Sequence, residues 1–202
     1  MTEERSININ KDNFSHTKKA LLKMRTILIF GEINQEISES VTADLLNLSF
    51  ENSKPINIVI SSQGGHVESG DTIHDMIKFI NNQVNIIGTG WVASAGLLIY
   101  LAAEKEHRFS LKNTRFLLHQ PSGGMQGEVT DIQIHAEEII KTKKRLNNIV
   151  ANATGQKLQK IEKDAERDYW LSAEEAKEYG IVKKIVSSIE EVEMWCSVIA
   201  NK

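Results

Sequence analysis

Three residues in this sequence have the types and the chain order needed to activate a hydroxyl group for hydrolysis. Ser94 lies between two apolar runs, His119 ends the apolar segment 116–118, and Asp168 comes 49 positions after His119. A serine hydroxyl is a weak nucleophile until a base takes its proton, and a histidine oriented by a carboxylate is a common base. Each residue alone is weak evidence. Together they predict a hydrolase with Ser94 as nucleophile, His119 as base and Asp168 as the acid that orients it.

The surroundings of Ser94 suit the stabilisation of developing negative charge. Ser94 begins an apolar segment with helical character and small flanking residues. The free N–H groups of a first helical turn favour an anion, and small neighbours let a substrate backbone approach. We therefore expect the Ala95 N–H to donate a hydrogen bond to an oxyanion, with Gly64 or Gly65 supplying a second donor.

Short strands and helices alternate along the chain and must position these residues. Apolar runs predict strands at 26–30, 56–60, 84–88 and 115–118, and helical periodicity predicts helices at 37–50, from about 66 through 80, and at 129–153. This order is typical of a parallel sheet with crossover helices. In such sheets the carboxyl ends of strands gather functional groups. We expect Gly64, Gly65, Ser94 and His119 along one such edge.

The C-terminal half contains one long helical segment and one short, well-capped one. A glycine-rich stretch at 123–127 precedes the long helix at 129–153. A helix of this length in a small domain is expected to project and to pack on a partner, so self-assembly is predicted. Ser172 with Glu175 forms a capping box, and Gly180 suits the position after a helix end, which predicts a helix at 172–179.

Composition bounds the class of protein. The chain has 202 residues, 41% apolar and 25% charged, with a formal net charge of −3, which suits one domain and argues against nucleic-acid binding. Cys196 has no partner for an intrachain disulfide, and the longest apolar stretch, 95–103, is too short to span a membrane. We expect a cytoplasmic enzyme with a mobile arm at 1–20, a single domain at 21–202, and no metal, because the other histidines lack ligand spacing.

Four segments of the chain resemble the ClpP-type proteolytic subunit of ATP-dependent Clp proteases. They are residues 61–65, 90–96, 119–124 and 167–180, and the resemblance runs from about residue 21 to residue 186. It implies an α/β, ClpP/crotonase-like fold with repeated ββα-type units and a projecting handle, a strand and long helix at about 123–154.

The resemblance also implies roles for individual residues and for partners. Ser94, His119 and Asp168 would be catalytic, and Gly65 and Ala95 would supply the oxyanion hole. No cofactor is implied. Heptameric rings, stacked as a 14-mer through the handle, would enclose a chamber in which unfolded polypeptides are cleaved. An AAA+ unfoldase such as a ClpX- or ClpC-type ATPase would feed the polypeptides into this chamber. Residues expected to contact substrate are Gly64, Pro121, Gly123 and Gly124.

The sequence departs from the family pattern and leaves alternatives open. The departures, which indicate a divergent paralogue, are at Asn57, Val59, Gln63, Trp91 and Tyr169. One alternative is a stand-alone or phage-type peptidase of the same fold that uses no unfoldase. Another is a regulatory ring subunit of low activity. An acyl-CoA hydratase or isomerase of the same superfamily is disfavoured, because those enzymes rely on carboxylates. The unfoldase, the cleavage preference and a mixed-ring assembly stay open.

Overall fold

The computed structural model describes residues 16–121, 124 and 126–192. Residues 16–23 are helical, so this helix crosses residue 20, where the boundary of an N-terminal arm was expected. The remaining elements follow in the order β1 (Thr26–Ile33), α2 (Gln35–Glu51), β2 (Ile56–Gly65), α3 (Val67–Phe79), β3 (Val84–Ala93), α4 (Ala95–Tyr100), a 3₁₀ turn (Lys105–His107), β4 (Arg108–Leu111), β5 (Arg115–Leu118), α5 (Val129–Thr154), α6 (Leu158–Asp164), β6 (Tyr169–Ser172), α7 (Ala173–Tyr179) and β7 (Lys184–Val186).

The strands form one sheet that is parallel except at one end. Strands β1, β2, β3, β4 and β7 are neighbours in that order and all pair in parallel. Strand β5 pairs in parallel with the end of β3, and β6 runs antiparallel to β5. The expected parallel sheet with crossover helices is therefore present, and β6 is the exception: the chain leaves β5, passes through α5 and α6, and returns antiparallel to β5.

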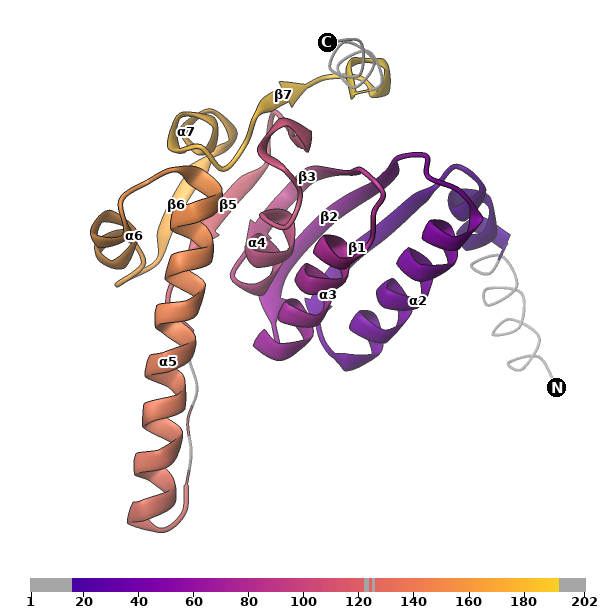
Figure 1. Ribbon diagram of the computed structural model, residues 1–202. Coiled ribbons are helices and arrows are strands. Elements are labelled where there is room, and N and C mark those ends of the chain that lie inside the picture. The colour runs from indigo at the N-terminus through magenta and orange to yellow at the C-terminus, as the bar shows by residue number, and fades with distance from the viewer. Residues whose placement is uncertain (1–15, 122–123, 125, 193–202) are drawn as a thin grey trace, which may run out of the picture.

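Helices α2, α3 and α4 cover the same face of the sheet, as Figure 1 shows. Alternate residues of the central strands point into this layer, and Ile58, Ile60 and Ile86 are fully buried there. They pack against apolar residues of the helices, including Leu45 and Ile73. In β2 this alternation is regular: one side of the strand is buried and the other is partly or fully exposed, which is the pattern of a sheet covered on one face.

Two strands continue beyond the ends expected from the apolar runs. Strand β2 was expected to end at residue 60 but extends to Gly65, and β3 was expected to end at residue 88 but extends to Ala93. The register shifts between Ile60 and Ser62, and Ser62 Oγ donates to the Gly31 carbonyl at 2.6 Å. The irregularity lets a polar, glycine-containing segment stay in the sheet, so the catalytic candidates follow the strands directly.

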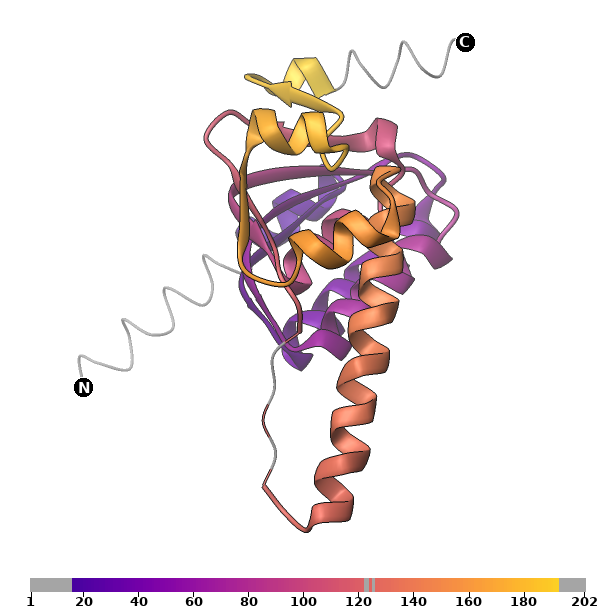
Figure 2. The same cartoon turned by 90° about the vertical axis from the view of Figure 1, so that its left-hand side faces the viewer.

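The long helix and the short capped helix were both predicted correctly. Helix α5 ends at Gly155, which adopts the left-handed conformation, and its N-terminal half extends beyond the other described elements in both views (Figures 1 and 2). In α7 the Ser172 hydroxyl accepts from the Glu175 N–H while the Glu175 carboxylate accepts from the Ser172 N–H, and Gly180 is left-handed. The capping box and the glycines that follow the helix ends act through local backbone geometry. For this reason the sequence alone could predict these helix ends.

Candidate active site

Ser94 occupies a strained turn between β3 and α4. Its backbone has φ 54° and ψ −122°, a conformation that a residue with a Cβ adopts only at a cost of about 1–3 kcal/mol. The Ser94 N–H donates to the Leu117 carbonyl at 3.2 Å, which ties the turn to β5. A sharp strand-to-helix turn presents a hydroxyl outside the sheet, at the N-terminal end of the helix that follows.

His119 and Asp168 are brought together by the antiparallel pairing of β5 and β6. Leu118 lies opposite Tyr169 at the end of the pair, so the residues just beyond them face each other. His119 Nδ1 lies 3.2 Å from Asp168 Oδ1, with 27% of the histidine side chain exposed and 64% of the aspartate side chain exposed. The Gln120 N–H donates to the Ala165 carbonyl at 3.0 Å, which anchors the chain directly after the histidine.

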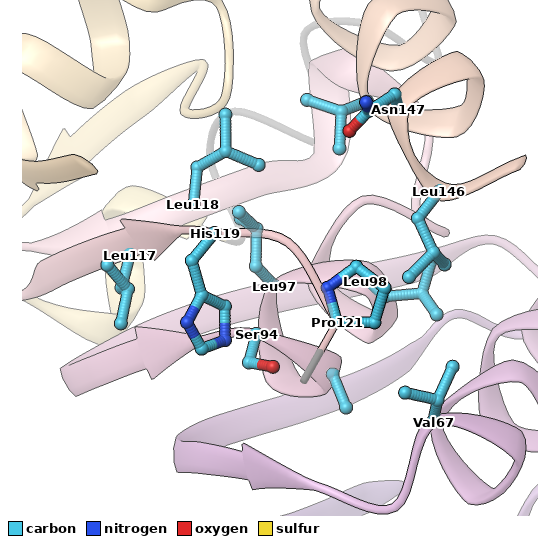
Figure 3. A pocket seen from close by; sticks show the side chains of 12 residues that line it. Val67, Ser94, Leu97, Leu98, Leu117, Leu118, His119, Pro121, Leu146 and Asn147 are labelled. Atoms are coloured by element: carbon cyan, nitrogen blue, oxygen red, sulfur yellow. The ribbon is translucent and has the colours of Figure 1, made fainter. Parts of the chain in front are cut away.

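Ser94 and His119 line the same pocket, and Figure 3 shows the histidine ring beside the serine side chain. Ala93 is in register with Leu117, which places the residues that follow the two strands side by side. No hydrogen bond joins the Ser94 hydroxyl to His119 within the described part of the chain. Catalytic hydrogen bonds are often long or misaligned in ligand-free enzymes, and a rotation about the serine Cα–Cβ bond redirects this hydroxyl.

The paired glycines lie directly against the serine turn. A Cβ at Gly64 would lie 2.6 Å from the Ser94 Cβ and 3.1 Å from the Ala95 nitrogen. A Cβ at Gly65 would lie 2.2 Å from the Ile33 carbonyl oxygen. Both glycines have positive φ, so steric room and backbone conformation each require glycine here. The Ala95 N–H belongs to the first turn of α4 and has no partner within the helix.

An apolar pocket opens beside Ser94 between α3, α4 and α5 (Figure 3). Of the residues expected to contact substrate, Pro121 lines this pocket. Gly64 instead backs the serine turn, no atom lies within 4 Å of a Cβ built at Gly124, and Gly123 lies outside the described residues. Lining residues that were not predicted from the sequence are Val67, Leu97, Leu98, Leu146, Asn147 and Val150. Five of them are apolar, and their spacing is equally typical of core residues. Asn147 is polar and carries no such signal.

Two of the departures from the family pattern have structural partners. The ring of Tyr169 lies 5.8 Å from that of Tyr179 and packs on the main core. The Asn57 side chain accepts a hydrogen bond of 2.8 Å from Asn85 on the neighbouring strand. Tyr169 therefore contributes to the interior of its own chain, and Asn57 is held by an amide pair across β2 and β3.

Neither a metal site nor a membrane-spanning helix is found in the described residues. No group of three histidine, cysteine or acidic side chains there is arranged to hold an ion. None of the helices in residues 16–121, 124 and 126–192 has the length and apolar character needed to cross a bilayer.

The fold and the pocket together define a serine hydrolase built on a one-sided α/β sheet. Residues 9–189 match the family model described as Clp protease, and the chain belongs to this family. It is 60% identical over 172 residues to "ATP-dependent Clp protease proteolytic subunit 3" of Rhizobium etli, which covers 85% of this chain and 89% of the relative. It is 52% identical to proteolytic subunit 2 of Pseudomonas aeruginosa, covering 85% of each chain.

Solved structures agree with the family assignment. The chain superposes on a singly substituted variant of ClpP1 from Listeria monocytogenes with a TM-score of 0.82 and 55% sequence identity, covering 87% of this chain and 99% of that one. The structure described as "ClpP1 from Listeria monocytogenes" gives a TM-score of 0.79 at 53% identity, with the same coverage of both chains. The chain therefore has the ClpP fold and is a serine peptidase of the Clp family, as the sequence predicted.

Proposed function

We propose that Ser94, His119 and Asp168 are the catalytic triad of this peptidase. The observation that carries the proposal is that the ends of β3 and β5 and the start of β6 bring the three residues together. His119 Nδ1 lies 3.2 Å from Asp168 Oδ1, and the histidine ring lies beside Ser94 (Figure 3). Asp168 accepts a hydrogen bond from the Nδ1–H of His119, which fixes the tautomer and leaves the Nε2 lone pair free to act on the serine. The Ser94 oxygen then attacks the substrate carbonyl as its proton passes to His119.

The remaining steps use the backbone around Ser94. The carbonyl oxygen becomes an oxyanion that accepts hydrogen bonds from the Ala95 and Gly65 N–H groups. As the tetrahedral intermediate collapses, the peptide C–N bond breaks and His119 returns its proton to the leaving amine. The acyl group stays on Ser94 until a water, deprotonated by His119, attacks it and releases the carboxylate product. The close contact of Gly64 with the serine turn supports this arrangement, because it holds the strand that carries Gly65 against Ala95.

We further propose that the chain assembles into stacked heptameric rings that receive unfolded polypeptide from an AAA+ ATPase of the ClpX or ClpC type. The relatives' names, which describe proteolytic subunits of ATP-dependent Clp proteases, support the ATPase partnership. The projecting half of α5 supports stacking, because it exposes the large apolar side chains of Val129, Ile132, Ile134 and Ile140. Exposure of large apolar side chains to water is unfavourable, and packing against the handle of a second copy would bury them.

Replacing Asp168 with Asn tests the triad. The variant is expected to lower kcat for an unstructured peptide by about 10²-fold, less than for a buried triad aspartate, because solvent screens this exposed carboxylate. The asparagine keeps the size of the side chain but not the charge that stabilises the protonated histidine.

Glu166→Gln is the matched control. Glu166 is also exposed and lies close in sequence, but its carboxylate pairs with Lys143 at 3.2 Å. The kcat of the Glu166→Gln variant should stay within about twofold of that of the unmodified protein, as for most surface substitutions. Equal activity of Asp168→Asn and Glu166→Gln would remove Asp168 from the triad.

A further inference from the structure

Strands β3, β5 and β6 present an aromatic and cationic cluster on the sheet face opposite α4. Trp91 is in register with Arg115, and the Arg115 guanidinium lies 4.5 Å from the centre of the Trp170 ring. Trp91 is 44% exposed. The residues that follow each of the three in the chain, and therefore point to the other face, are buried: Val92, Phe116 and Leu171. We call Trp91, Arg115 and Trp170 the Trp–Arg cluster.

Strand alternation places the Trp–Arg cluster on the same face as two of the proposed catalytic residues. His119 is four positions after Arg115, and Asp168 is two positions before Trp170, so each pair is in phase. Four residues of extended chain span about 13 Å. An arginine side chain covers part of that distance, so the cluster lies within reach of a substrate that passes the catalytic histidine.

Arg115 has no carboxylate within ion-pair distance among the described residues. The nearest acidic influence is Glu175, whose carboxylate accepts hydrogen bonds from the backbone and hydroxyl of Ser172. These bonds hold the pKa of Glu175 below its usual range, and the charge of Arg115 adds a smaller effect in the same direction. Glu175 is thus engaged in the helix cap, while Arg115 rests on an aromatic face and retains donors for another anion.

The apolar pocket and the Trp–Arg cluster lie at different points along β5. The pocket is lined by residues of α3, α4 and α5 and by Leu117, Leu118 and His119 at the end of β5, whereas Arg115 begins that strand. An extended polypeptide with one side chain in the pocket would cross the strand ends at Ser94 and continue along the uncovered face. About three or four of its residues span the distance to Arg115.

We propose that the Trp–Arg cluster selects polypeptide substrates with an acidic side chain three or four residues from the cleaved bond; this rests on the proposed peptidase function. The substrate carboxylate pairs with the Arg115 guanidinium, and an adjacent apolar side chain lies on Trp91. The charge of Arg115 and the continuity of its face with His119 and Asp168 favour this occupant. A second copy of the chain covering the same cluster is the competing occupant.

The test measures binding of peptides to the Ser94→Ala variant, in which cleavage cannot change the ligand. Fluorescent peptides of one unstructured sequence carry Glu or Gln at each position up to four residues on either side of the preferred cleavage bond. We expect the peptide with Glu to bind about threefold more tightly than the peptide with Gln at one position three or four residues from the cleavage bond. This ratio corresponds to the free energy of an exposed ion pair, and it should decrease at high salt.

Second substitutions in the same background identify the cation responsible. Arg115→Gln should abolish the preference and Arg115→Lys should retain part of it, whereas Lys112→Glu, an exposed charge reversal before β5, should leave it unchanged. Equal binding of Glu and Gln peptides at every position would overturn the proposal. So would dissociation of the assembly by Arg115→Gln in sedimentation, which would assign the cluster to contacts between copies. Absence of cleavage by the unmodified protein with the binding preference intact would refute the peptidase proposal alone.

Discussion

Replacing Ser94 with Ala is expected to lower kcat/KM for peptide cleavage by about 10⁵-fold or more, because the attacking oxygen is removed. Alanine keeps the Cβ and therefore the backbone conformation of the turn, so folding and assembly should be unaffected. Hydrolysis of an internally quenched peptide, followed with sedimentation of the same sample, measures both quantities.

Ser40→Ala serves as the control for this substitution. Ser40 lies on α2 and bonds to Lys18, far from β5 and β6 in the fold. Its activity is expected to stay within about twofold of the unmodified protein. Retained activity in Ser94→Ala would exclude this residue as the nucleophile and leave the strained turn without a catalytic explanation.

Replacing Gly64 with Ala is expected to reduce kcat/KM by about 10²-fold or more. The new Cβ would lie 2.6 Å from the Ser94 Cβ and 2.9 Å from the Ala93 carbonyl oxygen, closer than real contacts allow. The turn that carries Ser94 must therefore move, and a displacement of about 1 Å in a catalytic group costs on the order of 10²-fold in rate. Steady-state kinetics with the same quenched peptide measures the loss.

Gly31→Ala separates this clash from simple backbone strain. Gly31 has φ 83°, close to the 94° of Gly64, but no atom lies within 4 Å of a Cβ placed there. Both substitutions should lower the free energy of unfolding by about 1–2 kcal/mol because of the positive φ. Only Gly64→Ala should lose activity. Similar activities in the two variants would show that the contact between Gly64 and the serine turn has no role in catalysis.

The apolar runs and helical periodicity predicted β1, β2, β3 and the helices α2, α3 and α5, because each has enough residues to show a pattern. Strand β5 has only four residues and was predicted from its apolar run, residues 116–118. These patterns did not predict β4, β6, β7 or α6, which have between three and seven residues. Elements this short are held by tertiary pairing and carry little periodic signal. The ends of β2 and β3 were missed for a related reason: glycines and serines indicate a turn in a sequence, whereas here they keep the strand close to the serine turn.

The candidate triad was chosen from residue type and chain order, but its geometry depends on an element that was not predicted. Asp168 meets His119 because β6 reverses and pairs antiparallel with β5. Nothing in the four residues Tyr169–Ser172 specifies that partner. The apolar pocket was also missed, since Leu146 and Val150 have the spacing of ordinary helix core residues. The contact between His119 and Asp168 and the apolar pocket both depend on packing between segments that are far apart in the sequence.

The most direct test of the account is to label the protein with a fluorophosphonate probe, separate the oligomers by size and locate the modified residue by mass spectrometry. The probe reacts with a serine whose hydroxyl is activated by a neighbouring base. We expect label on Ser94, in particles of several hundred kilodaltons, and a rate of labelling about 10²-fold lower in the Asp168→Asn variant. Absence of label on Ser94 in every size fraction, or label on another serine, would contradict the claim that Ser94, His119 and Asp168 form the active site.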